Sequence, residues 1–210
     1  MRPLTSLTNL FSLSSLFALL PPPSRIALIV PLFVLGLILP AHTQTEPFAV
    51  GNHLPTFSMT VPESSAHRSY LGLSAEASQF TLADVDAPAL LIQIFSMYCP
   101  ICQREAPEVN ALYVALHREG LADSIKILGL GAGNSDLEVQ VFQERYDVPF
   151  PLVSDPDYVL HKAFGGVGTP YFVLVQSSDS AEDGHVVRLS HLGAFDSVKD
   201  FLEALIKAKH

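Results

Sequence analysis

The chain has 210 residues, of which 49% are hydrophobic and 16% charged, and its formal net charge at pH 7 is −9. This length allows one domain of about 160 residues beyond an N-terminal extension. All 21 acidic residues lie at or after Glu46, whereas Arg2 and Arg25 precede it, so residues 46–210 carry 21 acidic and 10 basic side chains. This acidity argues against a nucleic-acid partner and against attraction to anionic lipid, because both need clustered lysine and arginine.

Residues 1–45 have the composition of a targeting segment. Arg25 is followed by an apolar run from Ile26 to Leu39, which is shorter than the roughly 20 residues of a membrane span but suits the apolar region of a secretory signal. Small residues around Ala41 offer contexts for cleavage. A second apolar patch, from Leu10 to Leu20, keeps a retained membrane anchor open. The segment predicts a periplasmic or other extracytoplasmic location, reached through a signal peptide or an anchor.

Residues 46–210 alternate apolar, strand-like runs with amphipathic helical patterns. The main strands are expected at 90–96, 125–130, 171–176 and 186–192. Helices are expected at 100–119, at 135–146, from Asp155-Pro156 to Gly165, and at 196–209. Short strands are expected at 70–73 and 80–82, with a turn or loop at 62–69. This alternation predicts an α/β layer fold with a central sheet.

Cys99 and Cys102 are the only cysteines, and they enclose the dipeptide Pro100-Ile101. An apolar strand pattern ends just before them and a helical pattern begins just after, which is the setting of a dithiol/disulfide redox centre. A zinc site would need two further ligands, and no second CxxC exists. A disulfide across two residues restricts the unfolded chain little, so its value is chemical. The sequence predicts a redox-active Cys99–Cys102 pair with no metal and no other cofactor.

Cys99 is expected at the N-cap of the helix, with Pro100 at the first helical position. A thiolate there faces the free N–H groups of the first turn, including that of Cys102, and the positive end of the helix dipole. Both effects lower the pKa of Cys99 and make it the attacking thiolate. Cys102, one turn inside the helix, is expected to be shielded and to resolve the mixed disulfide.

Thr169-Pro170 follows a glycine-rich turn and directly precedes an expected strand, which makes this peptide bond a candidate for the cis form. A proline at this place would leave a strand edge open beside the disulfide, where a substrate chain could pair. An ordinary proline at the start of a strand is the alternative.

The segment from Phe95 to Pro107, the later Gly168-Thr169-Pro170 and the opening from Val50 to Phe57 resemble the thioredoxin fold. Within that fold they are most similar to exported thiol-disulfide oxidoreductases of the TlpA/ResA type, in the redoxin (AhpC/TSA-like) superfamily. The resemblance spans residues 49–208. It implies a central mixed sheet flanked by helices, with an added helix and extended segment at 131–157, before the strand that follows the cis proline.

The same resemblance implies a protein-disulfide reductase with client proteins that carry disulfides or dithiols. A membrane thiol protein would supply the electrons, and an apocytochrome c is one client that the resemblance suggests. Pro107 matches a helix proline of the family. Glu105 matches a glutamate that would tune proton transfer on Cys102, with a solvated helix residue as the alternative. Gln93 replaces the buried acid of ordinary thioredoxins, which gives Glu105 more weight.

The resemblance also implies a surface that contacts the substrate around the two cysteines. Tyr98 stands where the family usually has tryptophan, and it would supply a flat apolar wall. The other residues expected on this surface are Pro100, Ile101, Thr169 and Pro170.

Two further classes of function stay open from the sequence. A peroxiredoxin-like thiol peroxidase would use Ser96 and an activating arginine, for which Arg145 and Arg188 are candidates. A non-enzymatic metallochaperone or redox-sensing module would bind metal through the dithiol. His161, or His185 with His191 on one face of a strand, would be weak candidates for further ligands. The loop 129–134 resembles a dinucleotide loop, but Asn134 stands at the third glycine position.

Overall fold

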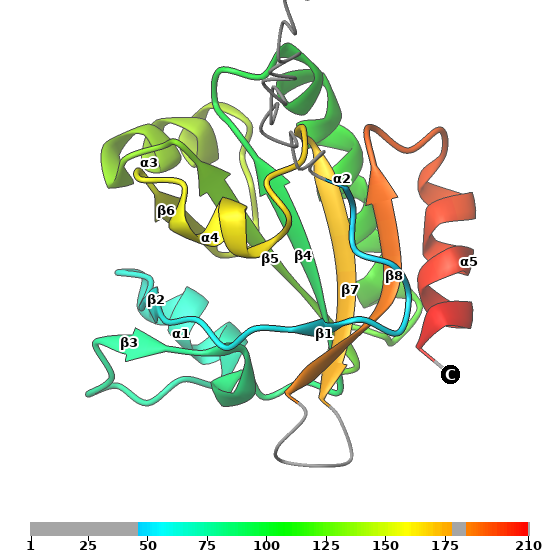
Figure 1. The fold of residues 1–210 in the computed structure, drawn as a ribbon, viewed down its shortest axis with the longest axis horizontal. Helices are drawn as coiled ribbons and strands as arrows, with labels where there is room; N and C mark the ends of the chain where they lie inside the picture. The colour runs from blue at the N-terminus through cyan, green and yellow to red at the C-terminus, as the bar shows by residue number, and fades with distance from the viewer. Residues whose placement is uncertain (1–45, 178–183, 210) are drawn as a thin grey trace, which may run out of the picture. The chain divides into compact units, whose positions relative to one another are not determined.

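The computed structural model describes residues 46–177 and 184–209, whose helices and strands are drawn in Figure 1. The predicted signal peptide or membrane anchor, residues 1–45, lies outside the described residues. Within the described ranges, no helix is both long enough and apolar enough to span a bilayer.

A six-stranded mixed sheet forms the centre of the domain (Figure 1). Its strands are β1 (His53–Leu54), β4 (Ala89–Phe95), β5 (Ile125–Ala132), β6 (Leu152–Asp155), β7 (Tyr171–Ser177) and β8 (His185–Leu192). Their order is β1-β8-β7-β4-β5-β6, with β4, β5 and β6 parallel and the other pairs antiparallel. All seven residues of β4 are buried, as is typical of a strand covered on both faces.

Helices cover both faces of this sheet (Figure 1). They are α1 (Ser65–Leu71), α2 (Pro100–Arg118), α3 (Asp136–Arg145), α4 (Val159–Ala163) and α5 (Val198–Ala208). Helices α2, α3 and α5 share a core with Leu91 and Phe95 of β4. Helices α1 and α4 share a second core with Leu90, Ile92 and Ile94 of the same strand. Because neighbouring β4 residues enter opposite cores, the predicted central sheet flanked by helices is confirmed.

The connection from β5 to β7 contains α3 and the parallel strand β6. Ser135 is the N-cap of α3, and it forms a reciprocal capping box with Glu138. This arrangement confirms the added helix and extended segment that the resemblance implied before the cis proline.

The structure differs from the sequence-based expectation at 62–73, where a loop and a strand were predicted. Residues Ser65–Leu71 form α1, whose N-cap Ser64 accepts the N–H of His67 and which ends at Gly72 in the left-handed region (φ +76°). A helix of two turns that buries Leu71 alone shows no apolar period, so only its caps signal it. Strand β2 (Met59–Thr60) precedes this helix in sequence and β3 (Gln79–Phe80) follows it, and the two strands form a separate two-stranded sheet. A 3-10 turn follows at Leu82–Asp84.

The helix expected to begin at Asp155-Pro156 starts later, at Val159. Asp155 is instead the last residue of β6, and its carboxylate accepts the N–H groups of Leu160 and His161, at 3.0 and 2.7 Å. The aspartate therefore does stabilise the start of α4, but from across a short turn rather than from the N-cap position.

Candidate active site

Cys99 is the N-cap of α2, as expected, and the N–H of Cys102 donates to its Sγ at 3.2 Å. Its backbone is extended, with φ −83° and ψ 112°, and Pro100 occupies the first turn, where a missing N–H costs nothing. Strand β4 ends at Phe95, so the loop 96–98 delivers the thiol to the helix N-terminus. Pro107 lies inside α2, at the place that the resemblance gave it.

The two thiols are both free and have opposite surroundings. Partial burial raises the pKa of Cys99, but hydrogen bonds with Cys102 and Thr169 and from the Cys102 and Ile101 backbones outweigh it, so its pKa lies below the ordinary thiol value. Full burial of the Cys102 side chain raises its pKa to about 12. As pH rises, Cys99 is therefore the thiol that ionises first, while Cys102 holds its proton.

The Thr169–Pro170 peptide bond is cis, which confirms that prediction. The Cys99 thiol donates to the carbonyl oxygen of Thr169 at 3.3 Å, so the two motifs, which lie 70 residues apart in sequence, meet at one sulfur atom. Pro170 itself is buried, whereas Thr169 is half-buried and Gly168 is exposed. A chain that approaches Cys99 from solvent would therefore meet Thr169 and Gly168 before the proline ring.

Exposed apolar side chains flank Cys99. Tyr98 is 65% exposed and Ile101 is 42% exposed, and Pro100 between the cysteines is exposed as well. The tyrosine ring and the isoleucine form an exposed apolar surface beside Cys99, and its contact with a client stays a prediction. The expected contact residues are thus accessible, apart from the buried Pro170.

Glu105 is buried on α2, which excludes the alternative of a solvated helix residue. Its Oε1 accepts the backbone N–H of Phe195 at 3.0 Å. Burial raises the pKa of this carboxyl, while the hydrogen bond from Phe195 and the nearby His191 lower it, and the net shift is upward. A carboxyl with a raised pKa one turn from Cys102 has the character of a proton acceptor, although its role there stays a prediction.

The loop before Cys99 is held by side chains that the sequence did not point to. The Oδ1 of Asn134 accepts the N–H of Met97 at 2.8 Å, and the Nε2 of Gln103 donates to the carbonyl of Met97 at 2.6 Å. The hydroxyl of Tyr98 donates to Glu138. The capping-box spacing of Ser135 and Glu138 could have marked the glutamate, but nothing local indicates its second partner, 40 residues away.

The candidate arginines of a peroxidase lie away from Cys99. Arg188 donates to Gln176, which lies at the C-terminal end of β7, whereas Pro170 precedes the N-terminal end of that strand. Arg145 is the last residue of α3 and lies over the ring of Tyr146. The arginines considered from the sequence therefore do not meet the thiol in this structure.

The histidines considered as metal ligands are not brought together. A register shift between β7 and β8 pairs His185 with Ser177 and His191 with Phe172, and partners five residues apart face opposite sides of the sheet, so the expectation of one shared face was wrong. His161 contacts the carbonyl of Val167 through Nε2 at 2.7 Å. Among residues 46–177 and 184–209, no group of three histidine, cysteine or acidic side chains has the geometry to hold a metal ion.

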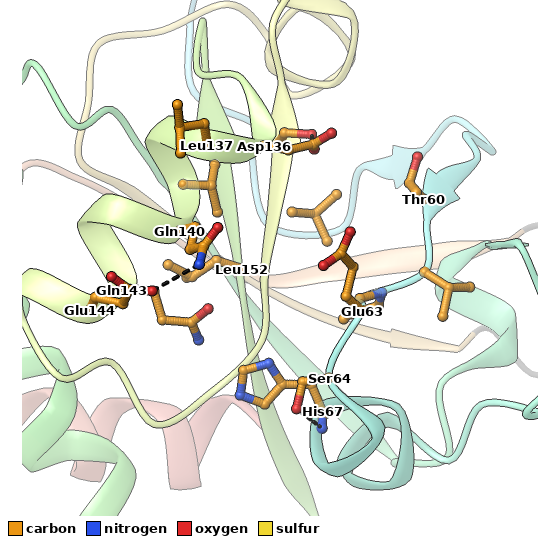
Figure 2. A pocket seen from close by; sticks show the side chains of 15 residues that line it. Thr60, Glu63, Ser64, His67, Asp136, Leu137, Gln140, Gln143, Glu144 and Leu152 are labelled. Carbon is orange, nitrogen blue, oxygen red and sulfur yellow. Dashed lines mark hydrogen bonds between the residues drawn. The ribbon is translucent and has the colours of Figure 1, made fainter.

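A groove of about 560 Å³ lies between α3 with β6 and the segment from β2 to α1 (Figure 2). Figure 2 shows Glu63 and His67 on one side and Gln140 and Glu144 on the other. Neither cysteine lines this groove. Cys99 is therefore reached from a surface outside this groove, and Cys102 is buried.

Known proteins that resemble this chain include thiol-disulfide oxidoreductases. The thiol-disulfide oxidoreductase ResA of Halalkalibacterium halodurans is 27% identical over 132 residues, which cover 62% of this chain and 69% of that protein. A thiol:disulfide interchange protein of the thioredoxin family from Chlorobium tepidum is 18% identical, with a TM-score of 0.53. The thioredoxin domain of a thiol-disulfide oxidoreductase from Bacteroides vulgatus is 17% identical, with a TM-score of 0.53. Each structural match covers 78% of this chain and 99% of the other, and together they support a thioredoxin-like fold.

A family model covers most of the domain. The model of the AhpC/TSA family matches residues 50–187, a range that holds both cysteines, Glu105 and the cis proline. The match spans more than half of the chain, and it confirms the superfamily that the sequence resembled. The chain belongs to the AhpC/TSA family.

Proposed function

We propose that this protein is a thiol-disulfide oxidoreductase that exchanges disulfides with client proteins. One observation carries the proposal: Cys99 caps α2 with a lowered pKa, while Cys102, three residues on, is buried with a raised pKa. A reactive thiolate beside a protected thiol is the arrangement that a two-step exchange needs. The names of the relatives, thiol-disulfide oxidoreductase among them, support the same activity.

In the reductive direction the Cys99 thiolate attacks one sulfur of a client disulfide. A bond forms between Cys99 Sγ and that sulfur, the client S–S bond breaks, and the other client sulfur leaves as a thiolate that takes up a proton. Cys102 then loses its proton and attacks Cys99 Sγ, which releases the second client thiol and forms the Cys99–Cys102 disulfide. Two electrons pass from the protein to the client, and Glu105 is the proposed acceptor of the Cys102 proton.

We extend the proposal to an extracytoplasmic reductase. The apolar segment 1–45 supports export, either with cleavage or as an anchor. A donor must return two electrons to the Cys99–Cys102 disulfide after each turnover, and a membrane thiol protein is the proposed source. An apocytochrome c, whose haem-binding cysteines must be reduced, is the proposed client, on the family resemblance alone.

The experiment that tests the activity is the trapping of a mixed disulfide. Reduced Cys102→Ala protein is mixed with a disulfide-bonded client protein, and the products are separated without reductant and weighed by mass spectrometry. We expect a one-to-one adduct through Cys99, and none with Cys99→Ser. An adduct that forms without Cys99, or none with either variant, would overturn the proposal.

The direction of the reaction follows from the reduction potential of the pair, measured by equilibration with dithiothreitol and alkylation of the free thiols. A value near or below about −270 mV supports a reductase that is fed by a donor. A value near about −120 mV would instead assign disulfide formation. Consumption of hydrogen peroxide in the absence of a protein disulfide, at a rate comparable to that of disulfide exchange, would favour the thiol peroxidase.

A further inference from the structure

The peptide units that connect β4 to Cys99 are held on both sides. Asn134 accepts the N–H of Met97 and Gln103 donates to its carbonyl, at 2.8 and 2.6 Å. The N–H of Cys99 then donates to the carbonyl of Ser96 at 3.0 Å. Only a few backbone torsions separate these contacts from the Cys99 sulfur. The position of Met97 therefore fixes the position of Cys99.

Asn134 is aimed at this loop by the sheet. It follows β5, its N–H donates to the carbonyl of Gly131 at 3.0 Å, and its own carbonyl accepts the N–H of Asp155 at 3.2 Å. The side chain is fully buried, and its Nδ2 has no hydrogen-bond partner among the described residues. An apolar side chain at this position would not bury an unpaired N–H, which costs free energy of folding. The hydrogen bond from Met97 is therefore the interaction that an amide adds at this position.

Tyr98 has a second anchor on the same segment. Its hydroxyl donates to Oε1 of Glu138, while Oε2 of that carboxylate accepts the N–H and the hydroxyl of Ser135, at 2.7 and 2.8 Å. The carboxylate therefore ties the start of α3 and the ring next to Cys99 into one unit. An exposed tyrosine without such a partner would sample several rotamers.

We propose that Asn134 and Glu138 are positioning residues of the redox centre, which hold the segment Met97–Tyr98 so that the Cys99 sulfur stays aligned with the Cys102 N–H and the Thr169 carbonyl. The inference rests on the proposed function and deepens it. The connection between β5 and β6 therefore contributes to the redox centre. Its first residues, Asn134 and Glu138, hold the loop that carries the attacking thiol.

The test is the pH profile of the alkylation of Cys99 by iodoacetamide, in the full chain with both thiols reduced. Asn134→Ala should raise the midpoint of the profile by about one pH unit, because a displaced sulfur loses the N–H of Cys102, which stabilises its thiolate. Tyr98→Phe, which keeps the ring and the capping box, should raise it less. Gln103→Leu should raise it too, and its effect should not add to that of Asn134→Ala, because both side chains hold Met97.

Asn110→Ala is the matched control. Asn110 also bridges two elements with its amide, since its Nδ2 donates to the carbonyls of Tyr146 and Asp147, at 2.7 and 3.3 Å, but at the end of α3 remote from Cys99. This variant should lower Tm and leave the alkylation midpoint unchanged.

An unchanged midpoint in folded Asn134→Ala protein, or an equal shift in Asn110→Ala, would overturn the inference. If Asn134→Ala does not fold, an unchanged midpoint in both Gln103→Leu and Tyr98→Phe would overturn it equally. The alkylation needs no client, so its outcome is separate from the proposed function. A Cys102→Ala protein that fails to trap a client would remove that function without moving the midpoint.

Discussion

The surroundings of Cys99 and of Cys102 differ more than their separation by three residues suggests. Cys99 caps α2 at the surface, between the exposed side chains of Tyr98 and Ile101. Cys102 is fully buried in the core that α2 shares with Phe95 of β4. One turn of helix thus moves a thiol from partial solvent contact with free N–H groups into an apolar core. The two identical side chains therefore differ in exposure and in pKa because of their positions in the helix.

Removing the surface thiol should have the largest effect on activity. Cys99→Ser should lower the rate of disulfide exchange by about a thousandfold or more, because a hydroxyl cannot replace the attacking thiolate. Serine is a good N-cap, so we expect the Tm of the variant to stay close to that of the wild type. Stopped-flow exchange with a disulfide client and a thermal melt check the two parts. A large fall in Tm would mean that the loss of rate reports unfolding instead.

The pH dependence should separate the two thiols next. Because the pKa of Cys99 is lowered, the rate of attack should rise about tenfold per pH unit and reach its plateau below the ordinary thiol pKa. Cys102 should stay protonated through this range, since burial raises its pKa to about 12. Alkylation followed by peptide mapping checks this for each cysteine. Equal modification of both at about pH 8, near the ordinary thiol pKa, would contradict the comparison.

The sequence predicts the features of the site that depend on neighbouring residues. The N-cap of Cys99 follows from a strand pattern, a proline and a helical pattern in immediate succession, and all three are visible in the chain. A glycine-rich turn and a strand start likewise made the bond before Pro170 a candidate for the cis form, and the bond is cis. Helix α1 was missed because two turns give too few residues for a period.

Contacts between distant residues could not be derived in that way. Asn134 and Met97 lie 37 residues apart, and Glu105 and Phe195 lie 90 apart, so no spacing rule connects them. The family resemblance selected Glu105 but could not say what would bury it. The shift of β8 against β7 similarly arises from the pairing of two strands, which is why the faces of His185 and His191 could not be read from their spacing.

A smaller effect is expected on the buried side of the comparison from Glu105→Gln. Glutamine keeps an acceptor for the N–H of Phe195 but cannot take the proton of Cys102. We expect resolution of the mixed disulfide to slow about tenfold, below the usual range for a base in direct contact, while attack by Cys99 is unchanged. Quenched-flow analysis of the mixed disulfide separates the two steps. Slowing of the first step instead would remove Glu105 from proton transfer.

The same substitution should change how stability depends on pH. Burial raises the pKa of Glu105 above its unfolded value, so its contribution is fully present below the unfolded pKa and is lost as pH rises through the folded pKa. Glutamine has no such loss. Urea unfolding from about pH 4 to about pH 8 should therefore show the variant gaining stability relative to the wild type as pH rises. A constant difference across that range would mean that the carboxyl titrates normally in the folded state.

The smallest effect is expected at the exposed rim around Cys99, which consists of Tyr98, Pro100 and Ile101. Ile101 contributes an apolar side chain beside Cys99 without a hydrogen bond or a charge, so Ile101→Ser should raise KM for a protein client about two- to fivefold through lost apolar contact. Exchange with a small disulfide such as oxidised glutathione, which covers little of the rim, should be unchanged. Val114→Ser, also exposed on α2 but remote from its N-terminus, is the matched control. If KM rises equally for both disulfides, Ile101 acts on the thiol and not on the client, and the rim is not a docking surface.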